Sequence, residues 1–226
     1  MILVRHGRTS ANVSGVLAGR TPGVRLDDTG VAQAERTAAR LAPVPLAAVV
    51  SSPLERCRQT AQAVVRAQTA ALRVAPDRGL TECDYGDWQG RPLKDLAKEP
   101  LWKVVQTQPS AATFPGGESL ASMQARVVDA VRRRDAAVEA EHGPGAVWVA
   151  VSHGDPIKAV VAEAVGAGLP GLQRVRVDPG SLTAVHLTEH RMVLLASNTM
   201  KGDLAPLVTR PAHAPAGDSE VGGGAG

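Results

Sequence analysis

MILVRHGRTSAN, residues 1–12, is the stretch that decides the fold. The apolar, partly β-branched run Met1–Val4 is typical of a strand buried in a mostly parallel sheet. It ends in Arg5-His6-Gly7, and the glycine allows the backbone to turn sharply and to approach a ligand closely. Because ligands of open α/β sheets bind beyond the carboxyl ends of the strands, this stretch predicts a binding edge where the strand stops.

The same order of strand, polar turn and helix occurs twice more. Residues 46–51 are followed by Ser52-Pro53, and the fully apolar run 146–151 is followed by Ser152-His153-Gly154. Strands that alternate with helices predict an α/β protein whose sheet is covered on both faces. We therefore expect a three-layer α/β/α sandwich with a mostly parallel central sheet.

The remaining elements follow from hydrophobic spacing and from breaker residues. Thr29 and Ser52 are the expected caps of the first two long helices, and Pro53 fits a first helical position. Residues 13–28 form a glycine- and proline-rich loop, long enough to suggest a functional role. We expect helices over roughly 29–42, 53–68, 118–141 and from 157 onward, a short strand at 72–74, and a hairpin formed by 182–188 and 192–197.

Length and composition indicate one domain. The chain has 226 residues, of which 44% are hydrophobic and 21% charged, and this suits a single core. We assign the domain to residues 1–205 and consider segment 91–118, with its short helical patterns and breakers, as a cap over the site. From residue 206 the composition shifts to proline, alanine and glycine, so we expect residues 206–226 to be a disordered tail.

Charge and cysteine content exclude several classes of protein. The net charge is +3, and no run of basic residues exceeds Arg132–Arg134, so we expect no nucleic-acid partner. No apolar run approaches the length of a membrane span, and the first strand begins at residue 2, which leaves no room for a signal peptide. Cys57 and Cys83 make neither a disulfide framework nor a zinc site. We expect a cytoplasmic protein that binds neither metal nor membrane.

Five side chains are expected to converge at one edge of the sheet. Arg5, His6, Arg56 and His153 each lie just past the carboxyl end of a predicted strand, and Glu82 follows a fourth turn. Guanidinium groups match the oxygens of a phosphoryl group bidentately. Two arginines and two imidazoles in one place therefore predict a site for a doubly charged tetrahedral anion.

Four motifs, in this order, resemble the histidine phosphatase superfamily, the phosphoglycerate-mutase-like proteins. The resemblance covers about residues 1–200 and implies the phosphoglycerate-mutase-like fold. The motifs are Arg5-His6-Gly7 with Thr9 and Asn12, then Ser52–Arg56, then Glu82 with Gly86, Trp88 and Gly90, and then Ser152-His153-Gly154.

The resemblance implies a role for each matching residue. His6 is the implied nucleophile, and Glu82 the implied general acid that later activates water. Arg5 and Arg56 would lower the pKa of His6 and so favour the neutral, nucleophilic imidazole. No metal or other cofactor is implied. The implied phosphate-binding residues are Arg5, Asn12, Arg56, His153 and Gly154.

Other residues leave alternatives open. Asp84, Asp87 and Asp155 compete with Glu82 for the acid role. Arg58 lies two positions beyond Arg56 on the same helix and should face elsewhere. Arg20 is either a contact for an anionic substrate or a solvated loop residue, and we favour the second interpretation. We expect the two cysteines to be packing residues.

Three functions are compatible with these motifs. The first is metal-independent hydrolysis of a small phosphorylated metabolite through a phosphohistidine. The second is a phosphomutase, for instance on phosphoglycerate, and the third is a non-catalytic module that binds phosphorylated ligands. The stretch after Gly90 is short and closes in 114–119, which resembles the phosphatases more than the mutases. The sequence indicates neither the substrate nor the oligomeric state, so a homodimer stays open.

Overall fold

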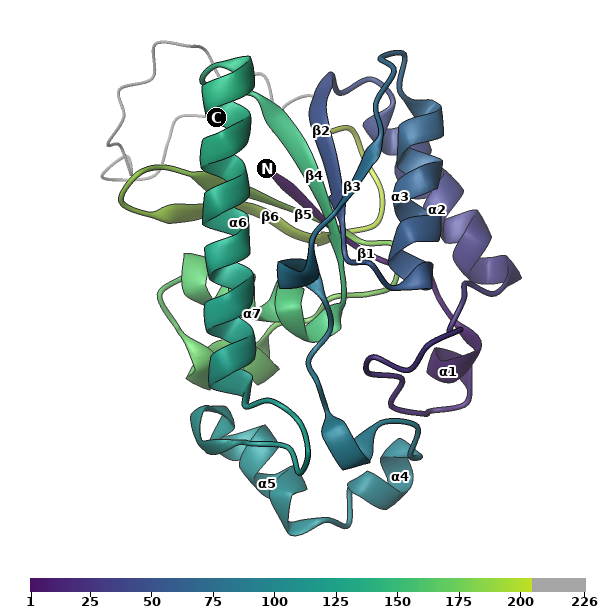
Figure 1. Ribbon diagram of the computed structural model, residues 1–226, viewed down its shortest axis with the longest axis vertical. Coiled ribbons are helices and arrows are strands. Elements are labelled where there is room, and N and C mark those ends of the chain that lie inside the picture. Colours follow the sequence, from purple (N-terminus) through teal and green to yellow (C-terminus); the bar gives the residue numbers. More distant parts are fainter. Residues whose placement is uncertain (205–226) are drawn as a thin grey trace.

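A six-stranded sheet forms the centre of the computed structural model, which describes residues 1–204 (Figure 1). Its strand order is β3-β2-β4-β1-β5-β6. The first four strands in that order run parallel, β5 is antiparallel to β1, and β6 is antiparallel to β5. The tail predicted for 206–226 lies outside the described residues. The strands are β1 (Ile2–Arg5), β2 (Leu46–Ser51), β3 (Val74–Pro76), β4 (Val147–Ser152), β5 (Leu182–Leu187) and β6 (Met192–Thr199).

Helices cover both faces of this sheet, so the expected three-layer sandwich is confirmed. Helices α2 and α3 lie on one face and α6 and α7 on the other, while α1, α4 and α5 gather at one end of the molecule (Figure 1). Short 3₁₀ turns occur at 78–80, 86–88, 109–111 and 169–174. The helices are α1 (Ser10–Val13), α2 (Asp28–Leu41), α3 (Glu55–Ala67), α4 (Leu93–Leu96), α5 (Pro100–Thr107), α6 (Leu120–His142) and α7 (Gly154–Ala164).

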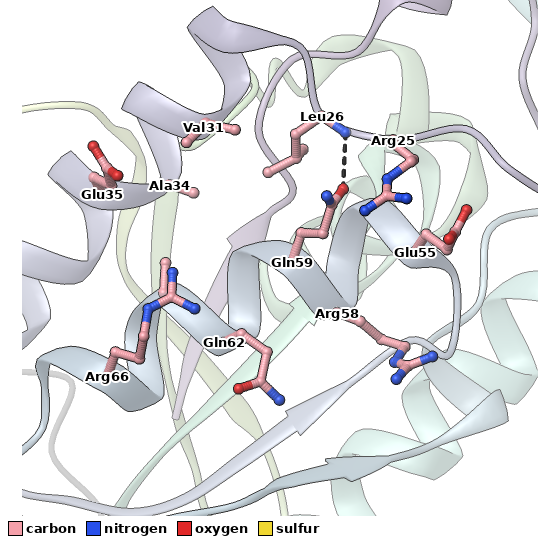
Figure 2. Close-up of a pocket in the computed structure, with 11 residues that line it drawn as sticks. Arg25, Leu26, Val31, Ala34, Glu35, Glu55, Arg58, Gln59, Gln62 and Arg66 are labelled. Carbon is pink, nitrogen blue, oxygen red and sulfur yellow. Dashed lines mark hydrogen bonds between the residues drawn. The ribbon is translucent and has the colours of Figure 1, made fainter.

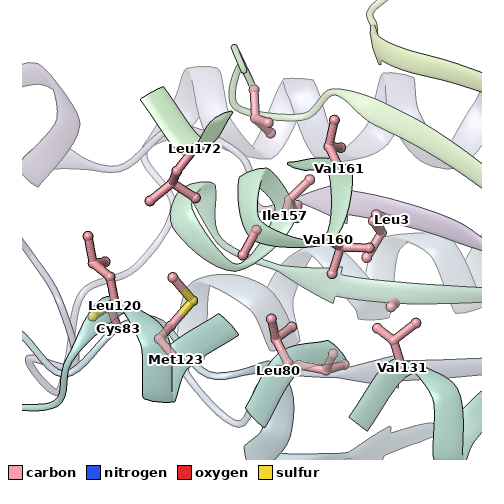
Figure 3. Close-up of a cluster of buried hydrophobic side chains, with 14 of the residues drawn as sticks. Leu3, Leu80, Cys83, Leu120, Met123, Val131, Ile157, Val160, Val161 and Leu172 are labelled. Carbon is pink, nitrogen blue, oxygen red and sulfur yellow. The ribbon is translucent and has the colours of Figure 1, made fainter. Parts of the chain in front are cut away.

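The core is divided by the sheet because successive strand side chains point to opposite faces. Leu3 packs with Ile157 and Val160 of α7 and with Val131 of α6, in the cluster drawn in Figure 3. Its neighbours Ile2 and Val4 instead belong to the cluster under α2 and α3. Every side chain of β1 before Arg5 is therefore buried, which explains the uninterrupted apolar run at the start of the chain.

The register of β1 against β4 places the two histidine-bearing turns at the same level. Val4 pairs with Val151 and Arg5 with Ser152, so both strands end together. The backbone N–H of His6 then donates to the carbonyl of Ser152 at 3.1 Å. His6 and His153 therefore lie side by side, just beyond the carboxyl ends of two adjacent parallel strands.

The predicted starts of all four long helices differ from the structure, and α6 and α7 begin at Leu120 and Gly154 rather than at 118 and 157. Asp27, not Thr29, caps α2: its Oδ1 accepts from the backbone N–H of Gly30 at 2.7 Å, and Thr29 lies within the first turn. Helix α3 begins at Glu55 after a cap residue, Leu54, that has no side-chain hydrogen bond. Ser52 lies three residues before it, and its hydroxyl accepts from the Leu54 N–H at 3.4 Å and bonds to the His153 imidazole.

The third strand also begins two residues later than predicted, at Val74 rather than Leu72. It pairs in parallel with β2 over Val49–Ser51, which fixes its register by contacts far away in the chain. The short segment 72–74 could not reveal that register on its own.

Gly7 is required by close packing against Gly30 at the start of α2. A Cβ at position 7 would lie 2.3 Å from the Gly30 carbonyl oxygen, and one at position 30 would lie 1.9 Å from that of Arg8. The close approach expected for Gly7 is therefore made to the protein's own backbone, and its φ angle is not positive.

Gly7→Ala is expected to destabilise the fold by about 1–3 kcal/mol, because backbone atoms must shift to relieve the overlap. Urea unfolding followed by circular dichroism measures the change. Gly154→Ala is the control, since its Cβ would meet the Arg5 guanidinium at an ordinary 3.7 Å. Equal midpoints for the two variants would contradict the packing argument.

Candidate active site

His6 is held as a neutral imidazole whose Nε2 carries no proton. Its Nδ1 lies 2.7 Å from the Gly7 carbonyl oxygen, and because a carbonyl only accepts, Nδ1 carries the proton. Nε2 is then an acceptor, and the Nε–H of Arg56 donates to it at 3.2 Å. Burial and the charges of Arg56 and Arg5 hold the pKa of His6 well below its usual range. Nε2 is therefore available as a nucleophile at neutral pH.

Arg56 reaches this imidazole from the first turn of α3 and is 2% exposed. One terminal nitrogen, Nη2, donates to the Gly19 carbonyl at 2.7 Å, which ties the 13–28 loop to the site. The other, Nη1, is buried and has no hydrogen-bond partner. A buried guanidinium nitrogen with nothing to bind is costly, and an anion would satisfy it.

Arg5 also has a buried guanidinium nitrogen without a hydrogen-bond partner. Its Nη1 donates to the Val177 carbonyl at 2.6 Å, while its buried Nε has no partner. The guanidinium lies against Gly154, the first residue of α7, at van der Waals distance from where a side chain would begin. Arg5 and Arg56 thus offer two unpartnered buried donors near His6, and Gly154 leaves room beside one of them.

His153 lies directly beside His6. The ring centroids are 5.2 Å apart with an edge-to-face tilt of 66°. Its Nε2 is hydrogen bonded to the Ser52 hydroxyl at 2.8 Å, and the Cys57 thiol lies 3.4 Å from the same atom. Burial and the charge of Arg56 hold the pKa of His153 well below its usual range. Cys57 is fully buried, and burial raises its thiol pKa to about 12, in agreement with a packing role.

Glu82 is suited to hold a proton near neutral pH. Burial raises its pKa to about 7, and the nearby charge of Asp155 acts in the same direction. The charges of Arg56 and Arg5 oppose this shift, which places the carboxyl within electrostatic reach of both arginines. Its Oε1 accepts from the backbone N–H of Cys83 at 2.9 Å, which restrains the carboxyl group.

The competing carboxylates are occupied or exposed. Asp84 accepts from the backbone N–H of Gly86 and pairs with Arg20. Asp155 accepts from the Tyr85 hydroxyl at 2.7 Å and pairs with Lys158 at 3.1 Å.

Asp87 is exposed and lies beside Gly116 in a turn. The geometry therefore favours Glu82 over these three as the acid.

Asn12 and Arg20 are placed differently from the roles considered for them. The Asn12 side chain is exposed, and its Oδ1 accepts from the Thr9 backbone at 3.0 Å in the capping box of α1. Its contact with phosphate stays a prediction. Arg20 is not simply a solvated loop residue, because all three of its side-chain nitrogens donate to protein oxygens, and its contact with an anionic substrate stays untested.

The pocket drawn in Figure 2 lies between α2 and α3, outside this histidine cluster. It has a volume of about 390 Å³ and mixes arginines and glutamates around an apolar floor. Arg58 lines it and is exposed, whereas Arg56 is buried and bonds to His6. The prediction that Arg58 faces elsewhere is therefore confirmed.

Within residues 1–204 no group of three or more His, Cys, Asp or Glu side chains is arranged to hold a metal ion. The same residues include no helix that is long and apolar enough to cross a membrane.

The chain belongs to the histidine phosphatase superfamily. The model of branch 1 of that superfamily matches residues 1–200. Phosphoserine phosphatase 1 of Hydrogenobacter thermophilus is 31% identical over 204 residues, which cover 88% of this chain and 91% of that protein. The α-ribazole phosphatase of Shigella flexneri superposes with a TM-score of 0.75 at 28% identity, covering 88% of this chain and 96% of that structure.

A longer relative shares the same domain. A bifunctional protein of Mycobacterium tuberculosis is 37% identical over 186 residues, or 81% of this chain and 49% of that protein. The chain thus spans about half the length of the mycobacterial relatives it matches. Family, fold and phosphatase relatives together support an enzyme of the histidine phosphatase type.

Proposed function

We propose that this protein hydrolyses a small phosphomonoester through a phosphohistidine formed on His6. The observation that carries the proposal is a pair of buried, unpartnered guanidinium nitrogens beside an imidazole whose Nε2 keeps its lone pair. An anion bound to those nitrogens would sit where Nε2 can reach it. Two relatives named for phosphoserine and α-ribazole support a small phosphorylated metabolite as the substrate class.

In the first step the Nε2 lone pair attacks phosphorus and the bond to the leaving oxygen breaks. Arg56 releases Nε2, and the unpartnered nitrogens of Arg5 and Arg56 stabilise the equatorial oxygens of the transferring group, while a contribution of His153 would need its ring to exchange a present partner for the phosphoryl group. Glu82, protonated below its pKa of about 7, gives its proton to the leaving alkoxide. The Nδ1–H···O bond to Gly7 holds the imidazole and helps to carry the positive charge that develops on the ring.

In the second step the phosphoryl group passes to water. The Glu82 carboxylate, now deprotonated, accepts a proton from the attacking water. The P–N bond breaks, its electrons return to Nε2, and inorganic phosphate leaves. Glu82 ends the cycle protonated, so acid and base are restored without any further reagent.

A trapping experiment tests this proposal. The protein, in excess chelator, is mixed with a ³²P-labelled phosphomonoester and quenched within a turnover. We expect a label on the protein that survives alkali and is lost in acid, as a phosphohistidine is, together with release of inorganic phosphate. A mutase would be indicated if the protein is labelled, the product is an isomer of the substrate rather than free phosphate, and the reaction depends on a bisphosphate primer. Binding without label or turnover would contradict catalysis.

The pH profile should depend on Asp155. Its negative charge helps to raise the pKa of Glu82, so Asp155→Asn lowers that pKa. Because the first step needs protonated Glu82, activity falls as pH rises through this pKa. We therefore expect the alkaline limb of kcat/KM to move to lower pH in Asp155→Asn.

The measurement compares both proteins on one substrate, which cancels the ionisation of the phosphate itself. Asp129→Asn, an exposed carboxylate paired with Arg133 on α6, is the control and should leave the limb in place. If the alkaline limb of kcat/KM stayed in place in Asp155→Asn, either Glu82 would not be the acid or Asp155 would not raise its pKa.

A further inference from the structure

The segment that carries Glu82 has no regular secondary structure. Residues 81–85 belong to neither a helix nor a strand, so their backbone groups need other partners. Such a segment would leave an acid loosely placed. Its partners here are side chains from three distant parts of the chain.

Two arginines hold the carbonyl groups on either side of the acid. Arg20 Nε, from the 13–28 loop, donates to the Glu82 carbonyl at 2.8 Å. Arg126 Nη1, from α6, donates to the Thr81 carbonyl at 3.0 Å and to that of Gly79 at 2.9 Å. The backbone of Glu82 is therefore fixed from both directions.

Glu118 bonds to both arginines and also binds the backbone of the segment 81–85 directly. Its Oε1 accepts from Arg20 Nη2 at 2.8 Å and from Arg126 Nη2 at 2.7 Å. The same oxygen accepts from the backbone N–H of Asp84 at 2.9 Å, and the Glu118 N–H donates to the Asp84 carbonyl. The Glu118 side chain is only 18% exposed, so these charged hydrogen bonds are partly shielded from water.

We propose that Arg20, Glu118 and Arg126 are positioning residues that fix Glu82 for proton transfer to the leaving group. We assign them no phosphate contact in this role, because every side-chain nitrogen of both arginines already donates to a protein oxygen. The inference rests on the proposed acid role of Glu82. It assigns to loop 13–28 and to the start of α6 a function that the sequence motifs did not indicate.

The leaving group distinguishes positioning of an acid from support of the fold. Phenoxide needs a proton as it leaves, whereas 2,4-dinitrophenoxide does not. Misplacing the acid therefore slows phenyl phosphate selectively, and kcat/KM reports the step in which the P–O bond breaks. A variant that merely weakens the fold lowers kcat/KM for both substrates by the same factor.

Arg126→Met keeps the aliphatic stem and removes every donor. We expect kcat/KM for phenyl phosphate to fall on the order of 10- to 100-fold, as for a small displacement of a catalytic group. With 2,4-dinitrophenyl phosphate the loss should be less than about threefold, because no proton is needed. Arg133→Met is the matched control: it lies on the same helix, pairs with Asp129 on an exposed face, and should change neither value.

Arg20→Met removes the second hold on Glu82 and should show the same selectivity, so the test stands if Arg126→Met fails to fold. Equal losses on the two substrates in the folded variants would overturn the positioning role.

Glu82→Gln is measured beside them as the reference. If it shows the selectivity and the arginine variants do not, the inference fails while the acid role survives. If Glu82→Gln itself shows none, the acid role and the inference fail together.

Discussion

Replacement of His6 by alanine is expected to lower phosphate release by on the order of 10⁴-fold or more, because it removes the atom that accepts the phosphoryl group. The Nδ1–H of His6 donates to the Gly7 carbonyl, so Nε2 of the same ring is unprotonated and carries the lone pair that attacks. The neighbouring His153 is turned toward Ser52 and Cys57, so it should not replace the nucleophile.

The His6→Ala measurement includes a structural control and a rescue. His190→Ala, in the exposed turn between β5 and β6, should retain full activity. Added imidazole should restore part of the activity of His6→Ala, since the lost ring leaves a cavity beside Arg56. Circular dichroism checks that the variant is folded. A folded His6→Ala protein that still turns over or takes up label would exclude the phosphohistidine.

Arg56→Met should lower kcat/KM by about 10²–10³-fold, the loss typical of removing a preorganised donor from a buried site. The side chain lies beside Nε2, is almost fully buried and holds one nitrogen without a protein partner. Its charge also helps to keep His6 neutral, so the acidic limb of the pH profile should move to higher pH in the variant.

Arg58→Met is the matched control for Arg56→Met. The two arginines lie two positions apart on α3, and Arg58 lines the outer pocket between α2 and α3 (Figure 2). Its replacement changes the net charge by the same amount and should leave kcat/KM near the wild-type value. Similar losses in both variants would mean that general electrostatics, rather than a placed guanidinium, supports the reaction.

The convergence of His6, Arg56 and His153 was predictable because strand, polar turn and helix occur three times in the sequence. Parallel strands in one sheet must end at one edge, so local patterns were sufficient. That β1 lies directly beside β4 was not predictable, because this pairing joins residues about 150 positions apart.

Ser52 and the two positioning arginines show where sequence patterns fail. A serine before a proline is a good cap signal, yet the imidazole of His153 binds this hydroxyl from another strand. Arg20 and Arg126 donate to backbone carbonyls of residues 79–82. Every residue has a backbone carbonyl, so the residue types in this segment give no sign that arginines bind there. Their role became visible only once the irregular course of that segment was known.

The direct pairing of β1 with β4 sets the spacing of the two histidines through the sheet rather than through the loops. The backbone hydrogen bond from His6 to Ser152 locks the spacing of the two imidazoles to the sheet itself. Loop 13–28 does not set that spacing, although its Gly19 carbonyl binds Arg56 and its Arg20 side chain binds the Glu82 carbonyl. A change confined to the loops would therefore alter the arginine and carboxyl groups of the site before it altered the distance between the two imidazoles.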